Sequence, residues 1–123
     1  MTILRGRVVT GVGNFAYWIE TLRELYQRKT GLWLFPGTLN IELGEAYTLP
    51  TRRTRLEAAE YDGTVSVNIV PCVILGREGF ILRTDQADTE AETRRIIEVA
   101  CEVKLRDQFG LRDGDAVQVE VDE

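Results

Sequence analysis

Thr38 and Asn40 lie two residues apart and alternate with the apolar residues Leu39 and Ile41. Successive side chains of a strand point to opposite faces, so this spacing places the Thr38 hydroxyl and the Asn40 carboxamide on one face. Both groups offer neutral oxygen ligands, which suit a Mg²⁺ that also binds a substrate phosphate. The alternative interpretation is the polar outer face of a half-buried strand.

A second candidate is the glycine-containing segment Thr10-Gly11-Val12-Gly13-Asn14, which joins a predicted strand to a predicted helix. Glycines let backbone amides approach a phosphate closely, and the N-terminus of the following helix adds positive dipole charge. The segment lacks the third glycine of a dinucleotide-binding fingerprint and the Gly-Lys-Ser/Thr ending of a P-loop. It is interpreted either as a phosphate-binding loop or as a structural turn.

Three charged side chains complete the candidates. Glu98 lies among apolar residues, which indicates either an outward-facing strand residue or a half-buried functional carboxylate. Lys104 and Arg106 flank a leucine and could present two cations to phosphates on one face. The alternative for that pair is a solvated surface.

The absence of histidine narrows the chemistry further. It excludes Ser-His and Cys-His nucleophilic catalysis, imidazole proton transfer, and most zinc and haem sites. Cys72 and Cys101 lie in separate apolar runs and are predicted to be buried free thiols. A net charge of -5 argues against binding to nucleic acid or anionic lipid. With no signal-like N-terminal segment and no apolar run of ~18 residues, the protein is expected in the cytoplasm.

The elements that must position these groups follow from hydrophobic periodicity. About six strands are predicted, at residues 3–10, 38–43, 64–75, 79–84 and 116–121, with residues 99–105 as a strand or strand–helix junction. Apolar residues at helical spacing predict one amphipathic helix of about 13 residues, ended by Gly31 as C-cap. Thr89 and Glu92 predict a capping box that opens a short helix over residues 89–97. Residues 76–79 and 112–115 are predicted turns, and the basic run at residues 52–55 a solvated loop.

These elements favour a mainly β fold. The strands do not alternate regularly with helices, which disfavours a parallel sheet built from β-α-β units. A compact, closed or nearly closed β-barrel with a helical insertion is expected instead. The chain has 123 residues and no linker, repeat or low-complexity segment, so residues 1–123 are expected to form a single domain.

Four blocks carry a resemblance to a known family. They are residues 6–13 (Gly-Arg-Val-Val-Thr-Gly-Val-Gly), Gly31 with residues 36–40 (Pro-Gly-Thr-Leu-Asn), residues 96–98 (Ile-Ile-Glu) and residues 105–115 (Leu-Arg-Asp-Gln-Phe-Gly-Leu-Arg-Asp-Gly-Asp). In this order the blocks resemble the archaeal-type CTP-dependent riboflavin kinases over nearly the whole chain. The resemblance implies a small six-stranded cradle-loop β-barrel with one inserted amphipathic helix and a short second helix. It also implies transfer of the CTP γ-phosphoryl group to the riboflavin ribityl hydroxyl with Mg²⁺, giving FMN and CDP.

The resemblance further implies a role for each candidate residue. Thr38 and Asn40 would hold Mg²⁺, and Glu98 would contact the flavin and orient or deprotonate its hydroxyl. Thr89 is placed on the flavin side, with Thr84 as the alternative. The nucleotide would be held by two segments, one of Gly11, Val12, Gly13, Asn14, Phe15 and Ala16, the other of Val103, Lys104, Leu105 and Arg106. Phosphoryl transfer depends mainly on positioning and charge neutralisation, so such a set is sufficient.

The chain departs from the family pattern at three places. Asn14 and Phe15 follow Gly13 where the family usually continues with Glu-Gly. Residues 84–89 form a longer and more acidic segment than the family's Lys-Thr-His/Tyr, and residues 101–102 are Cys-Glu in place of Ala-Pro. The acidic side chains at and after this segment would repel a triphosphate unless a metal intervenes. They are Asp85, Asp88, Glu90 and Glu92.

These departures keep other hypotheses open. The second hypothesis is a non-catalytic nucleotide- or flavin-binding barrel, or a small-molecule kinase of altered specificity. A third, a DNA-binding regulator, is disfavoured by the negative charge and the lack of a helix-turn-helix pattern. The expected partners are riboflavin or FMN and CTP or CDP, with neither nucleic acid nor a membrane, and the chain is expected to be a monomer or homodimer.

Overall fold

The computed structural model describes residues 1–11 and 14–122, so Val12 and Gly13 of the predicted nucleotide segment lie outside the described residues. The strands are β1 (Thr2–Val9), β2 (Leu39–Leu43), β3 (Thr54–Leu56), β4 (Val67–Ile74), β5 (Arg77–Thr84), β6 (Ile96–Ala100) and β7 (Ala116–Val121). The helices are α1 (Phe15–Thr21), α2 (Arg23–Thr30), α3 (Ala91–Arg94) and α4 (Leu105–Phe109), with 3-10 turns η1 (Ala58–Tyr61) and η2 (Ala87–Thr89).

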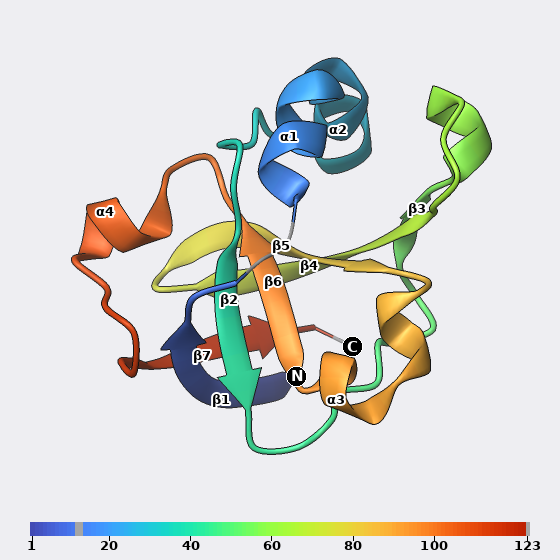
Figure 1. The fold of residues 1–123 in the computed structure, drawn as a ribbon. Helices are drawn as coiled ribbons and strands as arrows, with labels where there is room; N and C mark the ends of the chain where they lie inside the picture. Colours follow the sequence, from blue (N-terminus) through green and yellow to red (C-terminus); the bar gives the residue numbers. More distant parts are fainter. Residues whose placement is uncertain (12–13, 123) are drawn as a thin grey trace.

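The strands form one antiparallel sheet in the order β3-β4-β5-β6-β2-β1-β7 (Figure 1). The sheet closes because β7 also pairs with β4, through the partners Val73↔Glu120 and Ile74↔Val119. Six strands therefore make a barrel, which confirms the expected fold. The seventh, β3, pairs only with β4 and leads into η1, so that both project from the barrel as an arm (Figure 1).

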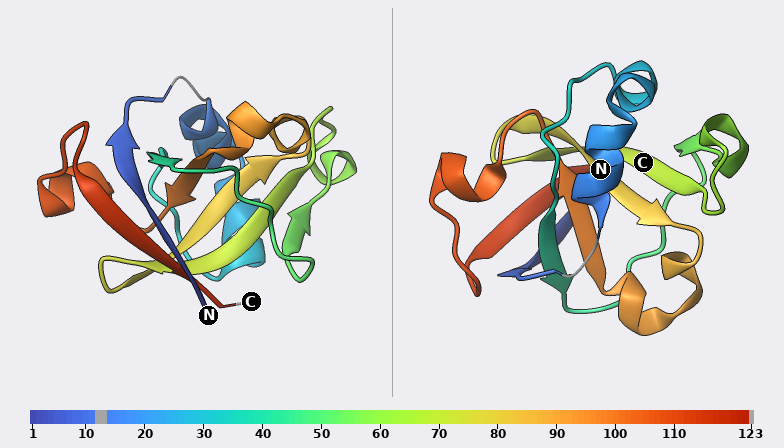
Figure 2. Two further views of the ribbon diagram at one scale, coloured as in Figure 1. Left: turned by 90° about the horizontal axis from the view of Figure 1, so that it is seen from below. Right: turned by 45° about the horizontal axis from the view of Figure 1, so that its top comes forward.

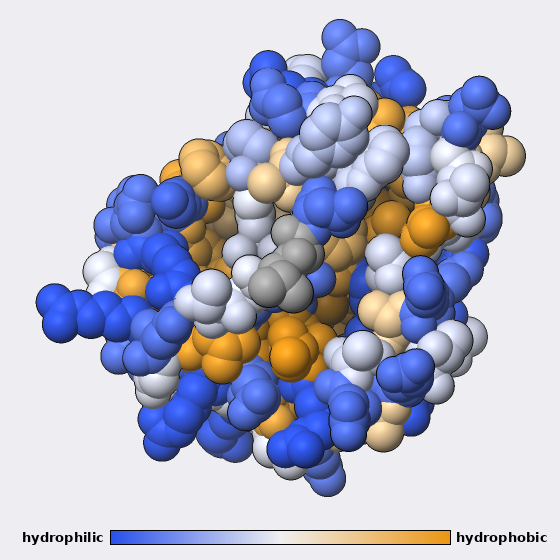
Figure 3. Space-filling view, in the orientation of Figure 1, coloured by the Kyte–Doolittle hydropathy of each residue, from blue (hydrophilic) through white to orange (hydrophobic). Residues whose placement is uncertain are grey.

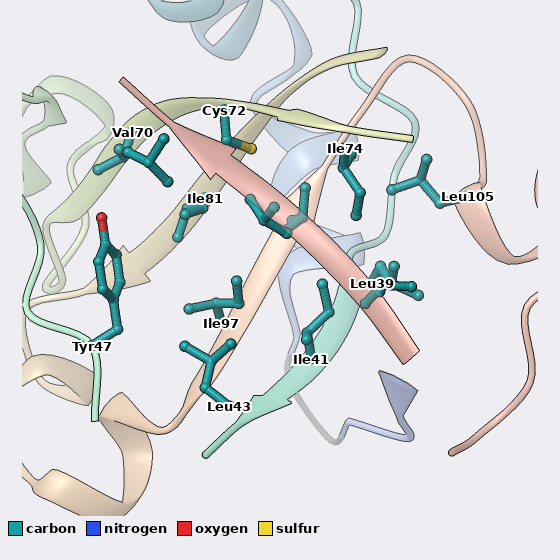
Figure 4. Packing of buried hydrophobic residues seen from close by; sticks show 14 of the residues in the cluster. Leu39, Ile41, Leu43, Tyr47, Val70, Cys72, Ile74, Ile81, Ile97 and Leu105 are labelled. Carbon is teal, nitrogen blue, oxygen red and sulfur yellow. The ribbon is translucent and has the colours of Figure 1, made fainter. Parts of the chain in front are cut away.

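Two apolar clusters hold the fold together. The first fills the inside of the barrel and includes Ile41, Ile97 and Val119 (Figure 4). The second includes Phe15 of α1 and Leu82 of β5, and it lies between the helix pair and the outer face of the sheet. Residues 79–83 of β5 are consequently buried on both faces. The two views of Figure 2 show α1 and α2 against one side of the barrel, which leaves the neighbouring outer face of β2 and β6 for a site.

The inserted helix differs in one respect from the sequence expectation. It is divided at Leu22, whose φ of -109° and ψ of 34° depart from helical values, so α1 and α2 replace one continuous helix. The backbone hydrogen bonds continue across the break, from Leu22 N–H to the Trp18 carbonyl and from Tyr26 N–H to the Leu22 carbonyl. Gly31 ends α2 as predicted, with the φ of 80° that favours glycine.

The hairpin between β4 and β5 was predicted too late in the chain. Its turn is Leu75-Gly76, with φ values of 51° and 75°, and residues 77–79 already belong to β5. Two successive positive φ values are the geometry of the two-residue turn that matches strand twist. Glycine is the usual second residue there, but leucine at the first gives no sequence signal.

The predicted capping box of the short helix does not form. The Thr89 hydroxyl donates instead to the Gln86 carbonyl within its own turn, and α3 begins after Glu90 with no side-chain cap. A capping box is found at η1, where Glu57 and Glu60 satisfy each other's backbone. Other expectations are confirmed: residues 99–105 are a strand–helix junction, residues 112–115 lead by a turn into β7, and both cysteines are buried and free. Among the residues described, no helix is both long enough and apolar enough to cross a membrane.

Candidate active site

Three of the predicted site residues meet on the outer face of β2 and β6. Asn40 and Glu98 are direct partners in the β2–β6 register, and Leu82 of β5 pairs with Glu98 on its other side. Thr38, immediately before β2, donates a hydrogen bond from its hydroxyl to Glu98 Oε1 at 2.8 Å. The two-residue spacing that suggested a shared face thus brings Thr38 and Asn40 together around one carboxylate.

The carboxylate of Glu98 is held in a half-buried position. Burial disfavours its charged form and raises its pKa, while the hydrogen bond from Thr38 acts in the opposite direction and is the smaller effect. A carboxylate with a raised pKa is a better proton acceptor than an exposed one. Glu98 therefore has the properties required for taking a proton from a bound hydroxyl group.

Two cavities lie beside this group of residues. The larger, of about 390 Å³, has walls from the end of β1, the start of α1, β2, β5, β6 and the segment from η2 to α3. Asn40 and Glu98 lie in its wall, together with the apolar side chains of Phe15, Leu82 and Ile96. The smaller cavity, of about 210 Å³, is lined by residues 35–39, Val99 and residues 103–106. Figure 3 shows a hollow with an apolar floor between α1 and α3, in the region of the larger cavity.

The described residues of the two predicted nucleotide segments line different cavities. From the first, Gly11, Asn14 and Phe15 line the larger cavity, whereas Ala16 is exposed and does not. The second, Val103 to Arg106, lines the smaller cavity, as does Thr38. Each cavity is thus lined by residues of one predicted segment. Asn40 and Glu98 line the larger cavity, and Thr38 lines the smaller one.

The expected face with two cations does not form. Because α4 begins at Leu105, Lys104 and Arg106 no longer have strand geometry and do not share a face. Lys104 forms an exposed ion pair with Asp107 at 3.8 Å. The Arg106 guanidinium donates to Asp113 Oδ1 at 2.5 Å and to the Val9 carbonyl at 3.2 Å.

Asp113 was predicted to lie in a turn, and no functional role was predicted for it. Its second oxygen accepts a hydrogen bond from the Thr10 hydroxyl at 2.7 Å, in addition to the ion pair with Arg106. Both contacts hold the Asp113 pKa below its usual value. The carboxylate therefore links the end of β1 to α4, and with them the two nucleotide segments. Its partners are up to 103 positions away in sequence, which no local pattern could reveal.

Arg83 is a second residue without a sequence signal. Its side chain is 3% exposed and forms part of the wall of the larger cavity. It donates to the Tyr47 carbonyl at 2.6 Å, to Asp88 at 3.1 Å and to the Arg94 carbonyl at 3.0 Å. Arg83 thereby ties the segment from η2 to α3 to the barrel, and this segment contributes a wall of the cavity.

The acidic segment is less repulsive than its composition indicated. Asp88 is paired with Arg83, and Asp85 forms an ion pair with Arg55 at 2.9 Å. The hydrogen bond from Arg55 lowers the pKa of Asp85 to about 2. Arg55 lies in β3 and binds Asn68 as well, so it is a structural ion-pair residue, whereas the basic run was predicted to be a solvated loop.

The candidate threonines of the flavin side separate in the structure. Thr89 does not line the larger cavity, and Thr84 and Thr93 do. The Thr93 hydroxyl donates to the carbonyls of Ala87 and Glu90. The Thr84 hydroxyl accepts the Ala87 N–H at 3.0 Å, so its own hydrogen remains available for a ligand.

The closed antiparallel barrel, with a half-buried carboxylate beside two cavities, places the chain among small closed β-barrels. The chain belongs more narrowly to the CTP-dependent riboflavin kinase domain family. The model of that family, DUF120, described as a domain of unknown function, matches residues 8–121. The resemblance inferred from the four sequence blocks is thereby confirmed.

Several relatives of the chain are named riboflavin kinase. One from Methanocella arvoryzae is 33% identical over 123 residues, which cover 95% of this chain and 56% of the relative. One from Pyrobaculum arsenaticum is 36% identical over 129 residues (96% and 60%), and one from Archaeoglobus fulgidus is 36% identical over 128 residues (96% and 54%). The chain therefore spans between about half and three fifths of the length of these relatives.

Proposed function

We propose that this chain is a riboflavin kinase that uses CTP and Mg²⁺. In the reaction, the terminal ribityl oxygen of riboflavin forms a bond to the γ-phosphorus of CTP, and the bond between that phosphorus and the bridging oxygen of the β-phosphate breaks. The hydroxyl proton passes to Glu98, and the products are FMN and CDP. Membership in the family and the riboflavin kinase name of its relatives support this proposal.

The observation that carries the proposal is the position of Glu98. Its raised pKa makes it a proton acceptor for a ribityl hydroxyl that enters the larger cavity. Thr38 donates to one carboxylate oxygen and fixes its orientation, which leaves the other oxygen for the substrate. Holding the hydroxyl next to its base and in line with a phosphate provides most of what phosphoryl transfer needs.

The oxygen atoms beside Glu98 fit a magnesium ion. In the described part of the chain, no group of three or more acidic or sulfur side chains could hold a metal by itself. The Thr38 hydroxyl and the Asn40 carboxamide are hard oxygen donors, and a Mg²⁺ bound with phosphate uses few protein ligands. When bound, Mg²⁺ would neutralise charge on the phosphates. Thr38 and Asn40 are the residues that would hold it.

The two cavities suggest where the substrates bind. The larger cavity, with Phe15, Leu82 and Ile96 in its wall, suits the flat apolar ring of a flavin. Thr84 replaces Thr89 in this proposal as the flavin-side hydroxyl, because Thr84 lines the cavity and keeps a hydrogen to donate. The smaller cavity, lined by Val103 to Arg106, suits the nucleotide. Gly11 and Asn14, in the wall of the larger cavity, would approach its phosphates from the other side.

The test is a turnover assay with the purified chain. Riboflavin, Mg²⁺ and each of CTP, ATP, GTP and UTP are incubated with the protein, and FMN is quantified by chromatography. CTP should give FMN, and Glu98→Gln and Asn40→Ala should abolish it, while Glu102→Gln at an exposed position should not. Failure to form FMN with any nucleotide, in a protein that still binds riboflavin, would contradict the proposal.

A second candidate function is a barrel that binds a nucleotide or flavin without catalysis. It is favoured by the pairing of Arg106 with Asp113, which leaves that guanidinium engaged within the protein. The buried Phe15, in place of the family's glycine, supports it too. In the same assay such a protein would bind ligand stoichiometrically, and its midpoint of unfolding would rise with ligand concentration while the nucleotide stays intact.

A further inference from the structure

Gly11 lies directly against the side chain of Asn40. A Cβ atom built on Gly11 would come closer than 3.0 Å to the Cγ, Oδ1 and Nδ2 atoms of Asn40 at once. Contacts that short do not occur between non-bonded atoms, so any side chain at position 11 would have to displace the carboxamide. Glycine at position 11 therefore allows the Asn40 carboxamide to keep the position it has in the structure.

Backbone conformation does not explain the glycine. Gly31, Gly76 and Gly114 adopt positive φ values, for which glycine is preferred, whereas Gly11 does not. Gly44 also has an ordinary φ, but a Cβ there would meet open space. Gly11 and Gly44 thus form a matched pair in which only the first contacts a neighbouring side chain.

The backbones on both sides of this contact are fixed. Val9 pairs with Asn40 in the β1–β2 ladder, and its carbonyl accepts a hydrogen bond from Arg106. The adjacent Thr10 hydroxyl is held by Asp113. Because these contacts hold the backbone at residues 9–11 and at Asn40, an added side chain would be accommodated by rotation of the Asn40 carboxamide.

The Asn40 carboxamide itself is restricted mainly by this contact. No hydrogen bond to its side chain is formed by any residue within 1–11 or 14–122, and it faces the larger cavity with Glu98 as its strand partner. A carboxamide without a hydrogen-bond partner can rotate about its last torsion, which has a broad energy profile. The surface of Gly11 limits that rotation.

We propose that Gly11 is a positioning residue for Asn40: its bare Cα, anchored through Thr10 and Asp113, holds the carboxamide oxygen in the orientation that receives a divalent cation. The inference rests on the proposed function in one respect, that Asn40 is a Mg²⁺ ligand. It adds that Gly11, the first residue of the predicted nucleotide segment, sets the geometry of the metal site.

The principal test measures cation affinity directly. Mn²⁺ is titrated into the protein in the presence of CDP, and free Mn²⁺ is followed by electron paramagnetic resonance. Gly11→Ala should weaken Mn²⁺ binding by about 10- to 100-fold, the usual effect of disturbing a residue that orients a metal ligand. Gly44→Ala should bind Mn²⁺ as the unsubstituted protein does. Riboflavin affinity, measured by flavin fluorescence, should fall much less than Mn²⁺ affinity in Gly11→Ala.

Asn40→Ala separates this inference from the proposed function. If Asn40→Ala weakens Mn²⁺ binding and Gly11→Ala does not, the positioning role is wrong and the metal site stands. If neither substitution has an effect, the metal ligands of the proposed function are wrong, and the inference falls with them. Gly11→Ala by itself should lower the midpoint of thermal unfolding, because the added methyl group displaces the Asn40 carboxamide. In the Asn40→Ala background it should not, because that carboxamide is absent.

Asp113→Asn provides a variant that adds no atom to the site. It removes the charge that pairs with Arg106 and weakens the anchor of Thr10. Mn²⁺ affinity should fall, by less than in Gly11→Ala, and the result stands even if Gly11→Ala does not fold. Unchanged Mn²⁺ affinity in folded Asp113→Asn would overturn the anchoring part of the proposal.

Discussion

At the scale of single residues, the chemistry of the site depends on how one carboxylate is held. Glu98 lies between apolar neighbours that face the barrel interior, and Thr38 is its hydrogen-bond donor. Burial raises its pKa, so the charged form is less favourable in the folded chain than in the unfolded chain. The same burial that suits Glu98 for proton transfer therefore makes its charge unfavourable for folding.

Replacement of Glu98 by glutamine removes the buried charge, so its effect on the stability of the fold should depend on pH. Because the folded-state pKa is raised, the stabilisation from the protonated form is complete below the pKa of an unfolded glutamate and is lost as pH rises through the folded-state pKa. Glu98→Gln should therefore be more stable than the unsubstituted protein at about pH 8, and the difference should vanish near about pH 4. Thermal unfolding across this range is the measurement, with the exposed Glu102→Gln as control. A stability difference that grows as the pH falls would contradict the assignment.

Two threonines allow a second prediction at the same scale. Thr84→Ala removes a hydroxyl from the wall of the larger cavity, and Thr89→Ala removes one that lies outside this wall and donates to the Gln86 carbonyl. A single lost hydrogen bond to a ligand costs about 1 kcal/mol, or about fivefold in affinity. Riboflavin titration should show this loss for Thr84→Ala and none for Thr89→Ala. A loss of riboflavin affinity in Thr89→Ala and none in Thr84→Ala would instead assign the flavin contact to Thr89.

At the scale of the elements, local periodicity predicts the face on which a residue lies, but it does not predict contacts between residues distant in sequence. The spacing of Thr38 and Asn40 placed both on one face because strand period is a local property. Arg83 and Asp113 gave no such signal, since their hydrogen-bond partners lie up to 36 and up to 103 positions away. Lys104 and Arg106 were misplaced because the strand ends at Ala100 and a helix begins at Leu105. The shared face of Thr38 and Asn40 was thus predictable from sequence, while the long-range hydrogen bonds of Arg83 and Asp113 were not.

Arg83 is the clearest test of those contacts. Arg83→Met keeps an unbranched apolar stem but removes the guanidinium that donates to the Tyr47 and Arg94 carbonyls and to the Asp88 carboxylate. Loss of one partner from a buried polar cluster costs about 2–4 kcal/mol. Denaturant unfolding should show a destabilisation of this size. Riboflavin affinity should also fall, because η2 and α3 line the cavity proposed to bind riboflavin. Arg77→Met, at the start of the same strand, should change neither, and equal effects of the two substitutions would contradict a specific role for Arg83.

At the scale of the molecule, the two apolar clusters share strands. The barrel interior takes Val70 and Ile81 from β4 and β5, and the cluster under α1 and α2 takes Ile69 and Phe80 from the same two strands. Neither cluster can lose its packing without exposing the other face of those strands. The mainly β composition and the helical insertion were predictable from sequence, but this sharing was not, because it depends on closure of β7 onto β4.

Shared strands lead to a prediction about the chain by itself, although its relatives are longer. Residues 1–123 should unfold in one cooperative transition, because a domain whose clusters share two strands has no part that can melt alone. Calorimetry should give an unfolding enthalpy of roughly 85 kcal/mol near 60 °C, equal to the van't Hoff value. Riboflavin should raise the midpoint of this single transition by mass action. Two resolved transitions, with the helix pair melting before the barrel, would show instead that the site rests on a separately folding layer.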